Sequence, residues 1–229
     1  MEVCFSIARL RHRLLAVWLL LTAAGLVVEL AKSASGRTLK HALVYFLGLS
    51  YEKNLPTWYS ASLLLLCGVL LLLVSAAKVQ VAGTYRWHWK LLAVIFLYMS
   101  LDEAISLHEL LSGFFNYGGV LYFGWVIPAS IFVLVVGSAY LSFLFHLPLR
   151  TRNQFVIAGA LYVGGALGIE FLLGYWTDLA GGKNLVYGLI DLVEESLEIL
   201  GVTLFVCALL EYLAEGAEKF TMVFQRRQE

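Results

Sequence analysis

Apolar residues in this chain form long runs separated by short polar stretches. A helix needs roughly 20 apolar residues to cross a bilayer, and six runs approach or exceed that length. The pattern predicts an all-α, polytopic membrane helical bundle of about six transmembrane helices in a single domain, residues 1–229. The predicted spans are Leu14–Leu30, Pro56–Ala77, Trp89–Phe115, Leu121–His146, Gln154–Trp176 and Val186–Tyr212.

The connection between the first two spans contains a shorter apolar run, His41–Leu49. Nine residues are too few to cross a membrane as a helix. This run therefore predicts a short interfacial or re-entrant helix in the first outer loop.

Composition agrees with a protein that lives in a lipid bilayer. The chain is 61% hydrophobic and 14% charged, and its mean hydropathy is +0.82, whereas soluble domains average about a quarter charged residues. The 16 basic and 16 acidic residues balance, so nucleic acid is not an expected partner.

Lysine and arginine concentrate near both ends of the chain and in alternate connections. Cytoplasmic segments of membrane proteins carry an excess of these residues. We therefore expect a multi-pass protein of the cell (inner) membrane with both termini in the cytoplasm.

The first half of the sixth span carries four acids, Asp191, Glu194, Glu195 and Glu198. At the helical step they fall within about 100° of arc on one face. Close carboxylates raise one another's pKa, and burial raises it further. The group must therefore hold protons, pair with cationic side chains or bind a cation, and acids at this depth are read first as functional.

The third span carries a second polar stripe in its latter half. Asp102, Ser106 and Glu109 share a face, since residues three, four and seven apart align on a helix, with His108 on one flank and Glu103 on the other. The third and sixth spans run in opposite directions, which brings their acids, and Glu52 before the second span, to the same outer leaflet.

These residues predict a carboxylate-rich site for a divalent metal ion whose identity stays open, because hard cations prefer oxygen ligands. His108 and Glu103 are the expected catalytic acid or base. The expected metal ligands are Glu52, Asp102, Glu109, Asp191, Glu194, Glu195 and Glu198.

Other acids and glycines receive separate expectations. Glu29, at the end of the first span, is expected at the membrane interface, and Glu170 either pairs with a neighbouring helix or joins the site. Gly164 and Gly168 form a GxxxG pattern, which is typical of close helix packing.

Three functions fit this pattern. The first is a metal-dependent enzyme that acts on a lipophilic substrate at the outer leaflet. The second is a proton- or cation-coupled transporter, because acids inside membranes mark ion pathways. The third is an accessory subunit of a larger membrane complex, in which the acids serve assembly with other membrane subunits. Protonated acids that only lock helices together are the structural alternative.

Three motifs resemble those of a group of uncharacterised bacterial multi-pass membrane proteins. They are Asn-Leu-Pro-Thr-Trp-Tyr-Ser at residues 54–60, Ser-Leu-Asp-Glu-Ala at 100–104 followed by His-Glu at 108–109, and Glu-Glu-Ser-Leu-Glu at 194–198. The resemblance covers most of the spans and implies no activity.

Overall fold

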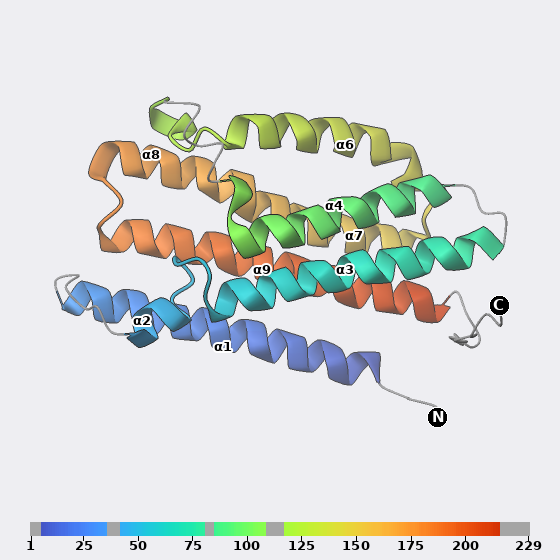
Figure 1. Cartoon of the computed structure of the whole chain (residues 1–229), viewed down its shortest axis with the longest axis horizontal. Coiled ribbons are helices and arrows are strands. Elements are labelled where there is room, and N and C mark those ends of the chain that lie inside the picture. The colour runs from blue at the N-terminus through green and yellow to red at the C-terminus, as the bar shows by residue number, and fades with distance from the viewer. Residues whose placement is uncertain (1–5, 36–41, 81–84, 109–116, 216–229) are drawn as a thin grey trace, which may run out of the picture.

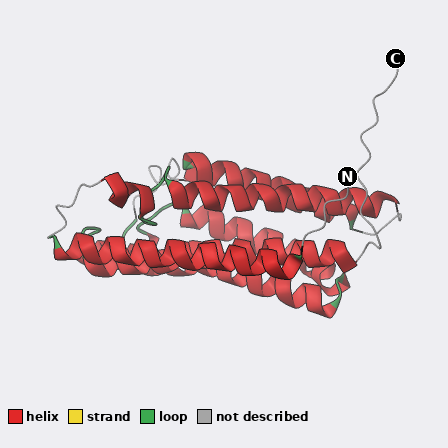
Figure 2. Cartoon of the chain, turned by 90° about the horizontal axis from the view of Figure 1, so that it is seen from below, coloured by secondary structure: helices red, strands yellow, loops and turns green. Residues whose placement is uncertain are grey.

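The computed structural model describes residues 6–35, 42–80, 85–108 and 117–215. Within these ranges all regular structure is helical (Figures 1 and 2), which confirms the predicted all-α fold. The elements are α1 (Ile7–Ala34), α2 (Ala42–Leu47), α3 (Leu55–Gln80), α4 (Arg86–Ile105), η1 (Gly119–Leu121), α6 (Val126–His146), α7 (Leu149–Val163), η2 (Gly164–Ile169), α8 (Glu170–Ala180) and α9 (Leu185–Glu215).

The long helices lie side by side along one axis (Figure 1). α9 packs against α1, α3, α7 and α8, α4 packs on α3, and α6 lies at the edge of the bundle. We call the end at which α1 finishes and α9 begins the acidic end. α1 begins and α9 finishes at the opposite end, where Arg11 is 3.6 Å from Glu211.

Five rods of the described bundle are long and apolar enough to cross a membrane. They are α1, α3, α6, the continuous α7–η2–α8 rod and α9. Large apolar side chains such as Leu20, Leu134 and Phe145 are exposed on their outer faces, as expected where lipid rather than water surrounds the bundle. The chain is therefore built as a membrane protein.

α4 departs from the predicted third span, Trp89–Phe115. The helix finishes at Ile105, and Ser106 adopts a left-handed conformation with φ 60°, which ends the helix and changes the direction of the chain. Its charged residues at both ends keep α4 outside the set of apolar rods. The predicted continuous stripe from Tyr98 to Gly113 is thus broken at Ser106, and residues 109–116 lie outside the described ranges.

The short apolar run before the second span does form a separate helix. α2 covers six residues and buries Val44. Asn54 connects it to α3: its Oδ1 accepts from the Thr57 backbone N–H at 3.1 Å, and its Nδ2 donates to the Gly48 carbonyl at 2.6 Å. This cap, with Pro56 in the first turn, is the structural reason for the Asn-x-Pro-Thr sequence.

Candidate functional site: a buried carboxylate cluster

Carboxylate side chains from three helices gather in the core toward the acidic end. α9 contributes four, α4 contributes one and α8 contributes one. Glu195 interacts electrostatically with Glu198 and Glu103, and more weakly with two further members. We call the six residues Glu103, Glu170, Asp191, Glu194, Glu195 and Glu198 the carboxylate cluster.

Hydroxyl groups from neighbouring helices orient two of these carboxylates. The hydroxyl of Ser60 in α3 lies within hydrogen-bonding reach of Glu103 in α4, and that of Tyr162 in α7 lies within reach of Glu198 in α9. Each contact joins a different helix pair, so the cluster is held in place by α3 on one side and α7 on the other. Buried polar groups require such partners to offset lost hydration.

Glu170 and Glu194 form a carboxyl–carboxyl pair between α8 and α9. Their side chains lie within hydrogen-bonding reach of each other, and Trp125 Nε1 donates to Glu170 Oε1 at 3.0 Å. An ionised carboxylate only accepts hydrogen bonds, so a bond between the two requires that one of them is protonated. Glu194 Oε2 and Asp191 Oδ2 are buried without a hydrogen-bond partner, which leaves acceptors available inside the cluster.

The π-helical turn η2 sets the position of Glu170 at the start of α8. A π turn widens the helix locally and is frequent at functional sites. Gly165 lies inside it, and a Cβ there would be 2.9 Å from the Glu194 carbonyl oxygen. Gly164 and Gly168, the predicted packing pair, have open space around them. The close helix packing predicted for this glycine-rich stretch therefore occurs at Gly165 and not at Gly164 or Gly168.

Glu29, which the sequence places near the end of the first span, is buried inside the bundle. Its side chain is 1% exposed and forms an ion pair with Lys32. Ser50 Oγ donates to Glu29 Oε1 at 3.4 Å and lies within hydrogen-bonding reach of Asp191. Gly188 of α9 leaves no room for a Cβ against the Glu29 carboxylate, so this ion pair fills the gap between α1 and α9.

A second polar group follows the end of α4. Because Ser106 turns the chain back, the His108 backbone N–H donates to Asp102 Oδ1 at 2.8 Å, and its ring Nδ1 lies 3.0 Å from Asp102 Oδ2. His108 Nε2 is 3.8 Å from Glu52 Oε1, and Ser106 donates to Glu52. We call Glu52, Asp102, Ser106 and His108 the His108 group.

The environment of His108, which lies beyond the α4 helix, favours its protonated form. Burial lowers the pKa of the imidazole, but the hydrogen bond to Asp102 and the charges of Asp102 and Glu52 outweigh it and raise the pKa above its ordinary value. The His108 ring also contacts Trp125 at a centroid distance of 5.1 Å. Trp125 thereby connects the His108 group to Glu170.

The structure divides the predicted metal site between these two groups. Glu103 of α4 faces the α9 acids, whereas Asp102 and Glu52 face His108, and Glu109 lies outside the described residues. Among the residues that are described, no three His, Cys, Asp or Glu side chains are arranged as they stand to hold a metal ion. The acids are grouped, but Glu103, Glu170 and Glu198 are each oriented by a polar side chain from outside the cluster.

Sequence reasoning missed the neutral partners of the carboxylates, Ser50, Ser60 and Tyr162. Each is a hydroxyl residue inside or beside an apolar run, which was the available signal. Hydroxyl residues are common in membrane helices, so the signal does not identify which acid each one meets.

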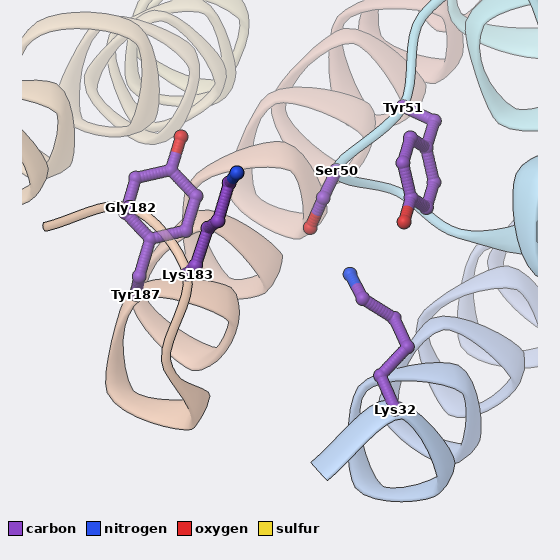
Figure 3. A pocket seen from close by; sticks show the side chains of 6 residues that line it. All are labelled: Lys32, Ser50, Tyr51, Gly182, Lys183 and Tyr187. Carbon is purple, nitrogen blue, oxygen red and sulfur yellow. The ribbon is translucent and has the colours of Figure 1, made fainter. Parts of the chain in front are cut away.

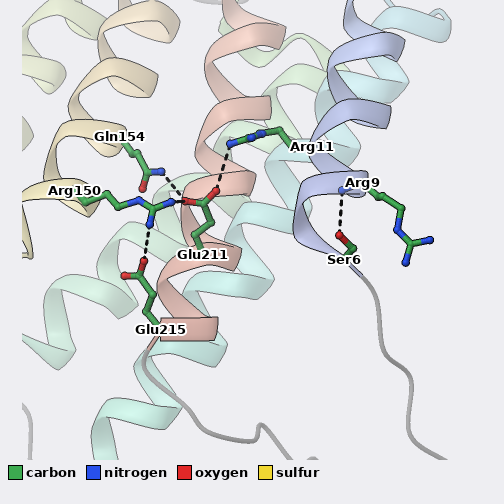
Figure 4. Close-up of polar contacts among 7 residues, drawn as sticks. All are labelled: Ser6, Arg9, Arg11, Arg150, Gln154, Glu211 and Glu215. Carbon is green, nitrogen blue, oxygen red and sulfur yellow. Dashed lines mark hydrogen bonds and ion pairs between the residues drawn. The ribbon is translucent and has the colours of Figure 1, made fainter.

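The middle of the bundle is mostly apolar, although the hydroxyl of Thr203 in α9 is buried there. Leu71, Ala93, Val206 and Leu209 are each fully buried there, which separates the carboxylate cluster from the opposite end. At that end Arg150 pairs with Glu211 at 2.8 Å and Glu215 at 3.3 Å (Figure 4). This exposed network joins α7 to α9 and is remote from the cluster.

Comparison with known proteins gives one match. A family model described only as a domain of unknown function matches residues 14–213, which include every described helix of the candidate site. No curated protein and no solved structure matches the chain.

Proposed function

The chain belongs to the DUF8692 family, a domain of unknown function, and we propose from its site that this membrane protein binds a divalent cation at the carboxylate cluster. The observation that carries the proposal is the charge balance of the core. Six acids share one region of the core, where Glu170 and Glu194 are buried and the other four are partly buried, and Lys32, the buried lysine beside them, is already paired with Glu29.

Carboxyl groups in this position are neutral when they hold protons and ionised when a cation takes the protons' place. Glu195, with Glu103 and Glu198, supplies oxygen donors alone. Such a set suits Mg²⁺, Ca²⁺ or Mn²⁺ better than softer metals. The hydroxyls of Ser60 and Tyr162 orient two of these ligands from outside, as partners of metal ligands commonly do.

We assign the observed arrangement to the protonated state, in which the Glu170–Glu194 pair holds a proton and the carboxylates do not yet point to one centre. Cation binding turns the side chains of Glu103, Glu195 and Glu198 toward a common point and releases protons. Metal affinity therefore rises with pH.

The site is proposed to be open to one side of the membrane. The apolar layer of Leu71, Ala93, Val206 and Leu209 supports this, since a transport path needs polar groups along its length. The distribution of lysine and arginine favours an outer-leaflet site with both termini in the cytoplasm of the cell (inner) membrane.

His108 is proposed as the acid–base group if the bound cation activates a lipophilic substrate. Asp102 fixes the imidazole through Nδ1 and leaves Nε2 toward Glu52, and a base oriented by a carboxylate is a recurrent catalytic arrangement. Glu103 then acts as a cation ligand rather than as the acid or base.

Calorimetric titration of the purified chain with Mg²⁺, Ca²⁺ and Mn²⁺ tests the proposal, with proton release followed in buffers of different ionisation enthalpy. We expect saturable binding that releases protons. Glu195→Gln is expected to weaken it by at least about tenfold, since it removes a charged ligand.

Glu215→Gln, at the exposed opposite end, is the matched control and is expected to leave binding unchanged. Absence of saturable binding by the folded wild-type chain contradicts the proposal. Equal binding by wild type and Glu195→Gln does so as well.

The shared proton of Glu170 and Glu194 favours a second candidate, proton-coupled transport. Proteoliposomes with an imposed pH gradient separate the two. A one-sided cation site gives no proton flux. Proton flux in the wild type that is lost in Glu194→Gln supports transport. Such transport requires a polar path that opens through the apolar layer.

A further inference from the structure

We propose that the acidic end carries a separate binding site for a phosphate group, beside the carboxylate cluster. A cavity of about 260 Å³ opens there. Three segments line it: α1, the connection from α2 to α3, and the connection from α8 into α9 (Figure 3). The lining residues are Lys32, Ser50, Tyr51, Gly182, Lys183 and Tyr187.

The chemistry of this lining selects an anion. Lys32 and Lys183 bring two ammonium groups, and Tyr51 and Tyr187 bring two phenol hydroxyls (Figure 3). No carboxylate is among the described residues that line the cavity. Ammonium groups donate hydrogen bonds and never accept them, so a cation has no favourable place here.

The two lysines differ in burial and in their contacts with other side chains. Lys32 is 9% exposed, pairs with Glu29 and lies 4.7 Å from the centre of the Tyr51 ring. Lys183 is exposed, in the connection that precedes α9. Lys32 therefore supplies a fixed, oriented donor, and Lys183 supplies the charge that a ligand neutralises.

The number and spread of the donors favour a phosphate over a carboxylate. A phosphate has at least two charged or strongly accepting oxygens beyond its ester links and meets lysine as a point charge. Donors that come from three segments surround such a group, whereas a planar carboxylate leaves part of them unused.

The cavity lies where phosphate groups occur in a bilayer. Its residues lie in the last turn of α1, in the connection from α2 to α3, and from residue 182 to the first turn of α9, and headgroups lie beyond the hydrocarbon core that apolar rods of this length cross. The same chemistry fits a lipid headgroup and a free phosphate, so the experiment separates these sources.

The site is also next to the carboxylate cluster. Lys32 and Tyr187 both interact electrostatically with Asp191. A phosphate-bearing ligand held at Lys183 would therefore lie beside the proposed cation, although phosphate binding itself does not depend on that cation.

Binding of two probes to the full chain in neutral detergent, without divalent cations, tests the proposal. The probes are inorganic phosphate and short-chain phosphatidic acid, measured by titration calorimetry. We expect at least one to bind saturably, with an affinity that falls as salt rises. Tighter binding of the phosphatidic acid identifies a lipid headgroup, and equal binding identifies the free phosphate group; both outcomes support the site.

Lys183→Gln is expected to lower the affinity for the probe by about tenfold, because it removes a positive charge that the probe neutralises. Lys183→Arg keeps the charge and is expected to retain most of the binding. Lys53→Gln changes an exposed lysine of the same end that does not line this cavity, and it should bind as wild type does.

Failure of the folded wild-type chain to bind either probe overturns the phosphate site, as does equal binding by wild type and Lys183→Gln. Circular dichroism confirms that each variant is folded. Parallel titration with divalent cations separates failure of the phosphate site from failure of the proposed cation site. Lys183→Gln is expected to retain cation binding, and Glu195→Gln is expected to retain phosphate binding.

Discussion

The side chains of Glu170 in α8 and Glu194 in α9 lie within hydrogen-bonding reach of each other. Two carboxyl groups form a hydrogen bond only when one of them carries a proton. We therefore expect these residues, 24 positions apart, to share one proton between two helices. Trp125, the residue that precedes α6, fixes the orientation of Glu170 by donating a hydrogen bond to it.

Glu194→Gln should preserve this contact, because an amide N–H replaces the shared proton as donor. We expect its free energy of unfolding to stay within about 1 kcal/mol of wild type. Glu194→Ala removes the partner of Glu170 and should cost about 2 kcal/mol. Reversible unfolding in mixed micelles measures both, with Glu215→Ala as an exposed control. Equal stability of the Gln and Ala variants would refute the shared-proton bond.

The Asp102–His108 contact should depend on pH. The pKa of His108 is raised in the folded chain, so the stability that the contact contributes is complete below the ordinary histidine pKa and is lost as pH rises through the folded-state pKa. Asp102→Asn should lower the pKa of His108, because the dominant raising interaction disappears. NMR titration of the imidazole follows the shift directly. An unchanged titration in Asp102→Asn would show that Asp102 does not hold the ring.

Gly165→Ala should destabilise the bundle by about 1–3 kcal/mol, because its Cβ would lie 2.9 Å from the Glu194 carbonyl oxygen and overpack the α9 contact. Gly159→Ala is the matched control, since a Cβ there has open space, and no loss is expected. Thermal unfolding in detergent compares the two. If the two variants unfold alike, the close approach at Gly165 does not limit stability.

Glu29→Gln should cost about 3 kcal/mol, because it leaves the charge of Lys32 buried without its counter-ion. Adding Lys32→Met to that variant should recover much of the loss, since no unpaired charge remains. A double-mutant cycle measured by unfolding gives the coupling. Additive losses would indicate that the two side chains act independently.

Part of this architecture could be predicted from local pattern alone. Apolar runs of about 20 residues predicted helices that cross a membrane, and the Asn54-x-Pro56 sequence indicated the start of α3. The sequence did not predict the end of α4, because the residues around Ser106 keep a helical polar period and nothing local marks the left-handed turn. That turn moves His108 back onto Asp102.

The candidate site was predictable as a set of acids but not as an arrangement. Helical periodicity alone placed four acids on one face of α9, because the angle between residues of one helix is fixed. They are Asp191, Glu194, Glu195 and Glu198. Which α4 acid meets that face depends on how α4 rotates against α3 and α9. Glu103 takes this position in the structure, while Asp102 turns to His108.

The sequence by itself determined that this is a helical membrane protein with too many buried acids to leave uncompensated, because length, hydropathy and charge are properties of single segments. Only the tertiary structure decided which groups compensate them: Lys32 for Glu29, a shared proton for Glu170 and Glu194, and hydroxyls for Glu103 and Glu198. Those partners come from different helices, and their distances depend on helix rotation and on the π turn before Glu170, which no single segment specifies.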